Sequence, residues 1–355
     1  MPSVRWTVFC RVIDNLGDAG VCWRLAADLA GRGETVQLVI DDASPLHRIA
    51  PRGAPGVDVL AWHDKLDFEG AEVVIEAFGC NPPQRYVEQM AKTIPPPRWI
   101  NLEYMSAEPH AQRSHALPSP QWQGPGRGLT KWFYYPGFSA STGGLLREPG
   151  LLRARAAFDR DAWLRTLHVA RGVQERVSVL FSYAHAGLPA WLAALADEPT
   201  LLLVPQGPAQ PAVQAALGPG MQRGALRALL LPWLTQADFD RVLWSSDLSV
   251  VRGEDSLVRA LWAGAPFVWQ LYPQHDGAHL RKLQAFMARW RADSPAEPPT
   301  SVDAWQQWWN IAPGAGPAPL PPLAPWGDAV RGWREHLAAQ TDLCSRLLGF
   351  VAGKR

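Results

Sequence analysis

The sequence predicts an α/β protein built from two domains with parallel sheets. A chain of 355 residues is too long for one hydrophobic core, so two domains are expected. Residues 7–40 follow a strand, helix and strand pattern, which requires parallel strands joined by a right-handed crossover. A second series of short apolar runs begins near residue 176 and repeats this architecture. The fold class is therefore α/β, with two Rossmann-like domains.

The first series of elements starts with an apolar run at 7–13, which predicts a strand. Val21, Leu25 and Leu29 then share one helical face, and glycines from position 31 end that helix. Further strands are predicted at 35–40, 57–60, 72–78, 99–102 and 131–135, and an irregular loop at 118–128. The first turn lacks the G-x-G-x-x-G fingerprint, which weakens a dinucleotide-binding interpretation.

The second series follows a helical stretch at 151–171, and we place the domain boundary near Gly172. Its strands are predicted at 176–183, 201–204, 228–231, 247–251 and 266–270. Proline-rich stretches at 295–299 and 312–325 predict loops, and 328–350 predicts a final helical stretch. We expect domains at 1–172 and 173–337, with a C-terminal helix at about 338–355 packing back on the first domain.

Composition narrows the functional classes. Thirty-four basic and 33 acidic residues leave a net charge of +1, which favours neither a nucleic-acid nor a membrane partner. No signal peptide or membrane-spanning run is visible, so a cytoplasmic protein is expected. Four cysteines without paired spacing predict reduced packing residues. Eighteen tryptophans are interpreted as packing residues rather than sugar-stacking platforms.

The stretch VVRGEDSLVRALWAGAPFVWQ at 250–270 carries a candidate binding site. It predicts a strand, a tight glycine turn and a helix. Such a turn lies at the carboxyl end of a strand, where ligands bind and a helix N-terminus favours phosphate. The turn offers Arg252 for phosphate charge, Glu254 for a hydroxyl or phosphate-linked group, and the N–H groups of Asp255 and Ser256. An ordinary exposed helix start with acidic residues is the alternative.

Two further pairs are candidate functional residues. Asp14 and Asp18 flank the first strand-to-helix turn, where two carboxylates could bind a cationic acceptor and take its proton. A turn aspartate at 14 and a helix N-cap at 18 explain them equally well. Phe181 and Tyr183 share one face at a strand end, so their rings could sandwich a nucleobase, with core packing as the equal alternative.

Metal-binding patterns are weak. D-x-D pairs begin at Asp159 and Asp238, but residues i and i+2 of a helix face different directions, so both pairs are predicted to be solvated surface. His275 and His279 share a helical face without a third ligand. We therefore expect neither a metal nor a cofactor.

Several stretches resemble one family across nearly the whole chain: DNLGDAGVCWRLAADLA, INLEYMSAE, LPSP, YPGFSASTGGLLRE, VLWSSDLSVVRGEDSLVRALWAGAPFVWQLYPQ and HDGAHLRKL. They are similar to the EarP protein-arginine rhamnosyltransferases, which modify translation elongation factor P. The resemblance implies a GT-B fold, with two Rossmann-like domains facing across a cleft. It also implies an inverting, metal-independent transfer of rhamnose from dTDP-β-L-rhamnose to an arginine of elongation factor P.

The resemblance also assigns residues. It implies Asp14, Asp18 and Glu254 as catalytic acids. The implied nucleotide-sugar site consists of Phe181, Tyr183, Gln236, Phe239, Arg252, Asp255, Ser256 and Tyr272. Two other functions stay open: a GT-B enzyme acting on a small molecule or lipid, and a non-catalytic nucleotide-sugar-binding protein.

Overall fold

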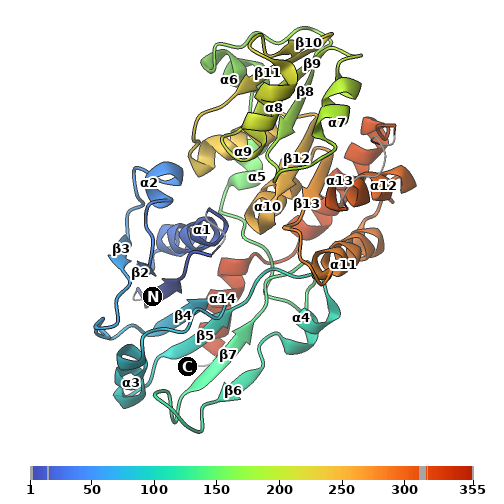
Figure 1. Cartoon of the computed structure of the whole chain (residues 1–355). Coiled ribbons are helices and arrows are strands. Elements are labelled where there is room, and N and C mark those ends of the chain that lie inside the picture. Colours follow the sequence, from blue (N-terminus) through green and yellow to red (C-terminus); the bar gives the residue numbers. More distant parts are fainter. Residues whose placement is uncertain (1–2, 14–15, 312–316, 318, 354–355) are drawn as a thin grey trace. The chain divides into compact units, whose positions relative to one another are not determined.

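A computed structural model describes residues 3–13, 16–311, 317 and 319–353 (Figure 1). The chain forms two compact units, one of Met1–Pro149 with Gln340–Arg355 and the other of Gly150–Ala339. The second unit therefore begins at Gly150, whereas the sequence suggests a boundary near Gly172. Helices α5 (Leu151–Ala156) and α6 (Arg160–Thr166) open it. They belong there because the Phe158 ring packs against Trp244 at 5.4 Å and Arg160 pairs with Asp247 at 2.7 Å.

The first unit contains a seven-stranded sheet in the order β3-β2-β1-β4-β5-β7-β6. Its parallel strands are β1 (Arg5–Cys10), β2 (Thr35–Ile40), β3 (Val57–Ala61), β4 (Val73–Ala77), β5 (Arg98–Leu102) and β7 (Thr130–Tyr134). The edge strand β6 (Pro118–Pro120) pairs antiparallel with β7, in a segment predicted to be an irregular loop. Prolines suit this edge because they cannot donate to a further strand. The strand order reverses between β1 and β4.

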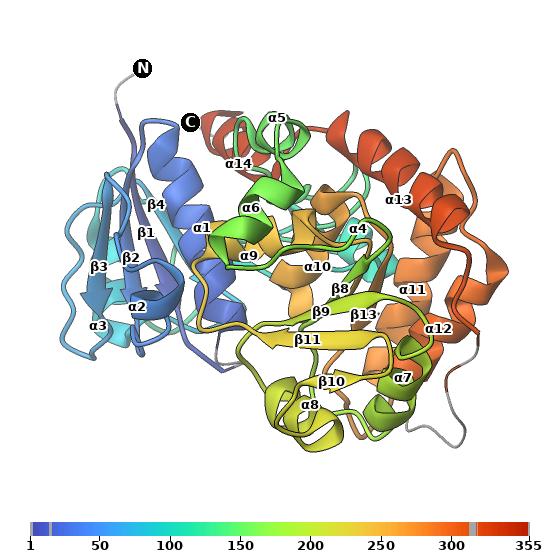
Figure 2. The same ribbon diagram turned by 90° about the horizontal axis from the view of Figure 1, so that it is seen from above.

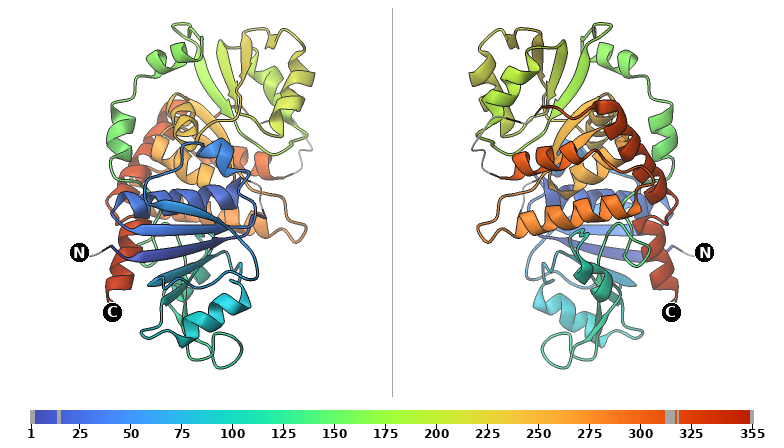
Figure 3. Two further views of the ribbon diagram at one scale, coloured as in Figure 1. Left: turned by 90° about the vertical axis from the view of Figure 1, so that its left-hand side faces the viewer. Right: turned by 90° about the vertical axis from the view of Figure 1, so that its right-hand side faces the viewer.

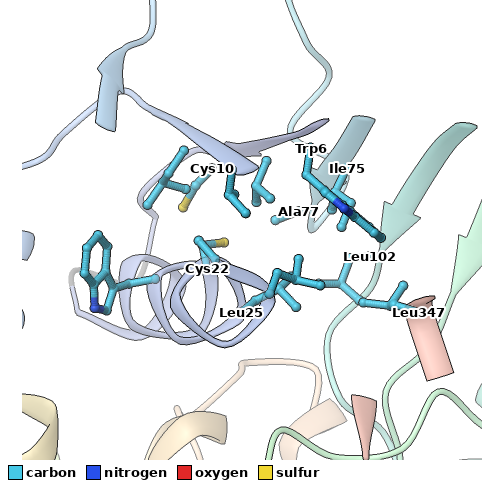
Figure 4. Packing of buried hydrophobic residues seen from close by; sticks show 14 of the residues in the cluster. Trp6, Cys10, Cys22, Leu25, Ile75, Ala77, Leu102 and Leu347 are labelled. Atoms are coloured by element: carbon cyan, nitrogen blue, oxygen red, sulfur yellow. The ribbon is translucent and has the colours of Figure 1, made fainter. Parts of the chain in front are cut away.

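The strands β1, β2, β4 and β5 are buried on both faces along most of their length, so they are largely apolar runs. Helix α1 (Gly17–Gly31) covers one face, where Cys22 and Leu25 point toward Cys10 of β1 and Ile75 of β4 (Figure 4). Helix α3 (Gln84–Lys92) covers the other face, and its Tyr86 joins a separate cluster. Two shorter helices, α2 (Leu46–Ile49) and α4 (Pro109–Ser114), complete the unit.

The C-terminal segment returns to the first unit. The predicted final helical stretch is two helices, α13 (Leu323–Ala338) in the second unit and α14 (Leu343–Gly353) in the first. Leu347 of α14 lies in the same core as α1 (Figure 4). Arg32 links α1 to the start of α14, because its guanidinium donates to Asp28 of α1 and to Asp342, which precedes α14, at 2.8 Å each. These two carboxylates and Cys344 lie close enough to hold a metal ion, but Arg32 already bonds both carboxylates.

The second unit contains a six-stranded sheet in the order β10-β11-β9-β8-β12-β13. Its strands are β8 (Arg176–Leu180), β9 (Thr200–Val204), β10 (Gln222–Arg223), β11 (Leu226–Leu230), β12 (Leu248–Arg252) and β13 (Phe267–Gln270). Among the described strands of this second sheet, only β10 runs antiparallel. The strand order reverses between β8 and β12.

Helices α7 (Leu188–Leu195), α8 (Ala209–Leu217), α9 (Gln236–Trp244) and α10 (Gly253–Ala263) connect these strands. After β13 come α11 (Ala278–Asp293) and α12 (Thr300–Asn310), which gather with α13 beside that strand (Figures 2 and 3). Tryptophans fill this region, as predicted from their number. The Trp290 ring stacks on Phe267 at 5.6 Å and on Trp333 at 5.5 Å.

Helix α12 protects the edge strand β13 with two buried side-chain amides. Gln306 accepts a hydrogen bond from the Trp269 N–H at 3.0 Å and donates to the Phe267 carbonyl at 2.9 Å. Asn310 accepts from the Leu271 N–H at 2.8 Å and donates to the Trp269 carbonyl at 2.8 Å. These amides do what a neighbouring strand would do, so the edge presents fewer unpaired backbone groups.

Two predictions from composition can be compared with the structure. All four cysteines are buried and unpaired, which confirms their interpretation as reduced packing residues. Among the described residues, no helix combines the length and the apolar character needed to cross a bilayer.

Candidate functional site

Several of the predicted site residues that the structure describes lie at the carboxyl edges of the two sheets, at the positions where strand order reverses. In open α/β sheets these reversal points are where ligands bind. In the first unit the reversal lies between β1 and β4, close to the start of α1, which carries Asp18. In the second unit it lies between β8 and β12, and Phe181 and Arg252 stand at the ends of these strands.

Asp18 is almost completely buried, with 2% of its surface exposed. It does not act as the N-cap of α1, because the helix begins at Gly17 and Leu16 is the cap residue. One carboxylate oxygen accepts a hydrogen bond from the Ile13 N–H at 2.9 Å, and the other accepts from the Tyr104 hydroxyl at 3.1 Å. The carboxylate is therefore oriented from both sides. Its predicted neighbour Asp14 lies outside the described residues.

Tyr104 follows β5 and is held by an aromatic stack. Its ring lies parallel to that of Phe78, with centroids 4.1 Å apart and planes 8° apart. Phe78 follows β4 and has φ of 58°, a left-handed conformation that is uncommon for a residue other than glycine. The Phe78 N–H donates to the Leu102 carbonyl at 2.7 Å, which ties the loop after β4 to the last residue of β5. Backbone strain of this kind often occurs at functional sites.

A polar network joins β4, β5 and β7. Glu76 is buried, and it accepts hydrogen bonds from Lys131 at 2.6 Å and from the Trp99 indole at 3.1 Å. Burial raises the pKa of Glu76, although Lys131 and Trp99 oppose this shift. Burial also raises the pKa of Glu103, which accepts from Asn101 at 2.7 Å. These contacts brace the strands that carry Phe78 and Tyr104.

In the second unit, aromatic rings surround the guanidinium of Arg252. It lies 4.8 Å from the centre of the Phe181 ring and 4.6 Å from that of Tyr183. Both cation–π contacts restrict the rotation of the guanidinium while leaving its N–H edge available for oxyanions. The sequence predicted that the Phe181 and Tyr183 rings could sandwich a nucleobase. In the structure both rings lie against the Arg252 guanidinium.

The remaining aromatic residues extend this cluster. Phe239 packs edge-on against Phe181 at 5.0 Å, and Tyr272 packs edge-on against Tyr183 at 5.3 Å. The Tyr183 N–H donates to the Gln270 side chain at 2.8 Å, which fixes the loop after β8 to the end of β13. Tyr272 is 65% exposed, so one side of the cluster is open to solvent.

Helix α10 begins directly after Arg252. Gly253 has φ of +70°, which a side chain would disfavour, and its carbonyl accepts a hydrogen bond from the Trp269 indole at 2.8 Å. Arg252 makes no side-chain capping hydrogen bond to the helix. Asp255 and Ser256 lie in the first turn, where helical N–H groups point outward and favour an anion.

Glu254 forms an ion pair with Lys282 of α11. Both side chains are about one-fifth exposed, so the pair is only partly screened by water. The contact connects the start of α10 to α11. Glu254 is consequently held in place by a cation from another helix, which the motif around Glu254 did not indicate.

Helix α9 carries the last predicted residues. Thr235 caps it by accepting from the Asp238 N–H at 3.1 Å, as the sequence predicts. Gln236 and Phe239 are three residues apart, so they lie on neighbouring positions of one face. The prediction that Asp240 is solvated was wrong: it is buried and receives two hydrogen bonds from Arg259, at 2.9 and 2.6 Å. A buried arginine makes Asp240 part of the fold rather than a metal ligand.

The other metal-like residues also have structural partners. Asp159 caps α6 by accepting from the Ala162 N–H at 2.9 Å, and Asp161 pairs with Arg171. His279 is buried, and its two ring nitrogens lie 3.1 Å from the Gln274 N–H donor nitrogen and 3.3 Å from the Asn310 carbonyl oxygen. His275 is exposed. These contacts agree with the interpretation of His279 as a hydrogen-bonded structural residue.

Four residues that lie near the predicted ones were not predicted from the sequence: Tyr104, Phe78, Lys282 and Gln270. Tyr104, Phe78 and Gln270 each stand at or just after the end of a predicted parallel strand, and this position was the available signal. Lys282 had no such signal, because α11 reaches Glu254 only through tertiary packing.

The two clusters can support different chemistry. The first holds a buried carboxylate that is oriented by a tyrosine hydroxyl, which suits binding a cation and accepting a proton. The second combines a stacked guanidinium with a helix N-terminus, which suits a diphosphate.

Comparison with known proteins shows a match over almost the entire chain. The family model described as "Elongation-Factor P (EF-P) rhamnosyltransferase EarP" matches residues 6–352. A Pseudomonas aeruginosa protein named protein-arginine rhamnosyltransferase is 41% identical over 374 aligned positions, covering 98% of both chains.

Solved structures agree with this match. A structure described as "Structural basis for EarP-mediated arginine glycosylation of translation elongation factor EF-P" has a TM-score of 0.67 and 31% identity, and covers 99% of this chain and 100% of that one. Arabidopsis thaliana UGT89C1, complexed with UDP-L-rhamnose, has a TM-score of 0.52 and 12% identity, with 99% of each chain covered. The second likeness concerns the fold alone, which is that of GT-B glycosyltransferases.

Proposed function

We propose, from the premise that this chain belongs to the EarP family of elongation factor P rhamnosyltransferases, that its donor is dTDP-β-L-rhamnose and that the transfer is inverting and needs no metal. The chain is a protein-arginine rhamnosyltransferase, and its acceptor is an arginine of elongation factor P. Because the acceptor is a translation factor, the reaction would take place in the cytoplasm.

The acceptor is a difficult nucleophile. An arginine side chain is protonated at physiological pH and its lone pairs are delocalised. Asp18 would hydrogen-bond one guanidinium nitrogen and take its proton as that nitrogen attacks the anomeric carbon. The hydrogen bonds from the Ile13 N–H and the Tyr104 hydroxyl would hold the carboxylate in the orientation that this step needs. Asp14 would help to hold the cation.

Donor departure is the second half of the reaction. The new carbon–nitrogen bond forms opposite the bond to the leaving dTDP, so the anomeric centre inverts and negative charge grows on the diphosphate. Arg252 and the N–H groups at Asp255 and Ser256 would stabilise this charge without a metal. Glu254 would orient the nucleotide or sugar.

The remaining assigned residues would bind the nucleotide. Phe181 and Tyr183 flank Arg252, Phe239 and Tyr272 pack against these two rings, and the exposed Tyr272 would meet an incoming base. Gln236, at the start of α9, would hydrogen-bond the base or ribose.

The single observation that carries the proposed mechanism is the orientation of the buried Asp18 carboxylate by Tyr104 at the strand-order reversal of the first sheet. The test is intact-mass analysis of the same organism's elongation factor P after incubation with this protein and dTDP-β-L-rhamnose. We expect a gain of one deoxyhexose, unchanged by a metal chelator and lost when the acceptor arginine becomes Lys. A gain only with added metal, or none with this donor, would contradict the proposal.

The acceptor is expected to be recognised as a folded protein. A short peptide would forgo the contacts that hold the arginine in position, and positioning accounts for much of the rate. We expect the docking surface to include residues near the start of α1, which carries Asp18, and the segment near Pro118, where the edge strand β6 begins. Efficient modification of an isolated loop peptide would refute this requirement.

A further inference from the structure

A cavity of about 780 Å³ lies within the second unit, away from the predicted donor site. Arg176, Asp247 and Pro266 line it, and they stand at or just before the first residues of β8, β12 and β13. The cavity is therefore at the amino ends of these parallel strands, whereas Arg252 and the aromatic cluster are at their carboxyl ends. Its volume is in the range of small-molecule sites.

The lining of this cavity is rich in arginine. Six arginines contribute to it: Arg155, Arg160, Arg171, Arg176, Arg331 and Arg334. Four of them have a carboxylate partner, and these pairs are Arg160–Asp247 at 2.7 Å, Arg171–Asp161 at 2.9 Å, Arg176–Glu198 at 3.3 Å and Arg331–Asp328 at 2.5 Å. Arg155 and Arg334 remain.

Both guanidiniums lie at the C-terminus of α10, Arg155 against Ala263 and Arg334 against Gly264. Arg155 donates from Nε to the Ala263 carbonyl at 3.0 Å, and within the described residues its other nitrogens have no protein partner. Arg334 approaches no carboxylate in the described chain more closely than that of Glu335, at 4.0 Å, and the Glu335 side chain is 75% exposed. Its guanidinium presses against Gly264, where an added Cβ would lie 2.3 Å from an Arg334 nitrogen.

The surroundings leave the two positive charges largely unbalanced. Burial lowers the pKa of Arg155, and the charges of Arg334 and Arg160 lower it further. Burial also lowers the pKa of Arg334. Guanidinium groups nevertheless stay protonated in proteins. The C-terminus of α10 offers about half a negative charge, which cannot neutralise both groups.

We propose that this cavity is a binding site for a small phosphate-bearing anion, held by Arg155 and Arg334. The two guanidiniums present several N–H donors with the planar geometry that suits phosphate oxygens. A cavity of about 780 Å³ is much larger than a phosphate ion, so the ligand we expect is a metabolite that carries a phosphate group. The opposite edge of the sheet carries the donor site, which makes this a second anion site.

The alternative is that both arginines serve only to cap α10. A capping role uses the Arg155 Nε–H and needs no ligand, so ligand binding distinguishes the two explanations. The test uses inorganic pyrophosphate as the probe, titrated calorimetrically at low ionic strength into the full-length Arg252→Ala variant, in which the predicted donor site is weakened. We expect saturable binding to this variant.

The matched comparison adds charge-removing substitutions to that background. R155Q/R334Q should weaken pyrophosphate binding at least tenfold. R153Q/R165Q removes two arginines that are exposed on α5 and α6 and do not line the cavity, so binding should change less than twofold. Melting temperatures and circular dichroism check that each variant is folded.

A second variant tests the same site in case R155Q/R334Q does not fold. Ala324→Glu, at an exposed position in the lining, keeps both arginines and supplies a competing carboxylate. It should weaken pyrophosphate binding severalfold. Absence of saturable binding in the Arg252→Ala variant, or equal losses in R155Q/R334Q and R153Q/R165Q, would overturn the proposal and leave the capping role alone.

Discussion

The Tyr104 hydroxyl donates a hydrogen bond to the Asp18 carboxylate at 3.1 Å, across 86 positions of sequence. Tyr104 follows β5 and Asp18 lies in the first turn of α1, so the fold of the first sheet brings them together. The stack on Phe78 fixes the Tyr104 ring, and the Ile13 N–H holds the other carboxylate oxygen. The Asp18 carboxylate is therefore oriented by Tyr104, a residue that lies outside the sequence motif around Asp18.

Tyr104→Phe should lower kcat about tenfold or more, because a hydrogen bond to a charged group contributes roughly 1.5–3 kcal/mol. The phenyl ring keeps its stack on Phe78, so the fold and the affinity for donor should not change. Steady-state kinetics with elongation factor P measure the effect. Tyr135→Phe is the control, since the Tyr135 hydroxyl has no hydrogen bond within the described residues. Unchanged kcat in Tyr104→Phe would remove Tyr104 from positioning.

Asp18→Asn should reduce turnover by about 100-fold to 10,000-fold, the usual contribution of a general base. An amide cannot take the proton, and its single oxygen cannot replace both carboxylate acceptors toward Ile13 and Tyr104. Donor affinity should stay unchanged, because the predicted nucleotide residues belong to the second unit. Mass analysis of the modified elongation factor P measures turnover, and calorimetry with dTDP measures donor-site affinity. Near-normal turnover would exclude Asp18 as the base.

Arg252→Ala should weaken dTDP-rhamnose binding about tenfold to 100-fold, since it removes a charge-assisted contact worth roughly 1.5–3 kcal/mol. Arg252→Lys keeps the charge but loses the planar group between Phe181 and Tyr183, so an intermediate affinity is expected. Calorimetric titration measures all three proteins. Equal affinity in the wild type and in Arg252→Ala would reject the phosphate role.

Lys282→Met should reveal coupling with Glu254. If Lys282 holds Glu254 in its working position, Glu254→Gln in the Lys282→Met background should cost less than in the wild type. We expect a coupling energy of about 1 kcal/mol in kcat/KM from the four proteins of the cycle. Arg281→Met removes an exposed neighbour and should have little effect. Strictly additive losses would show that the pair does not act together.

The stability of the first unit should depend on His115. Burial, with a smaller effect of Arg346, lowers the pKa of His115 from 6.5 to about 4, and its Nδ1 accepts from the Tyr135 N–H at 3.2 Å. Between these pH values the unfolded chain binds a proton that the folded chain excludes. The free energy of unfolding should therefore fall as pH drops from 6.5 to 4. His115 is partly exposed, so the loss should be on the order of 2 kcal/mol.

His115→Asn is the matched variant, because asparagine can accept the same backbone hydrogen bond without titrating in this range. Urea unfolding at pH 7 and pH 5 measures both proteins. The variant should lose less stability than the wild type on acidification. An identical loss in the two proteins would assign the acid sensitivity to other groups.

Sequence alone determined the α/β class and most of the strands. Periodicity is a local property, so β2, β3 and β5 were predicted within a residue or so of their observed bounds. Sequence also singled out Asp18 and the turn from Arg252 to Ser256, because polar residues after an apolar strand mark a carboxyl edge of a parallel sheet. The family followed from long motifs.

Only the tertiary structure decided which residues meet. Asp240 was predicted to be solvated, because residues two positions apart on a helix face different directions, but Arg259 of α10 bonds to it and both side chains are buried. Tertiary packing likewise brings Tyr104 to Asp18, Lys282 to Glu254, and Arg334 to Gly264. A side chain's neighbours depend on the order of strands and the packing of helices, and neither is encoded in the spacing of residues along one segment.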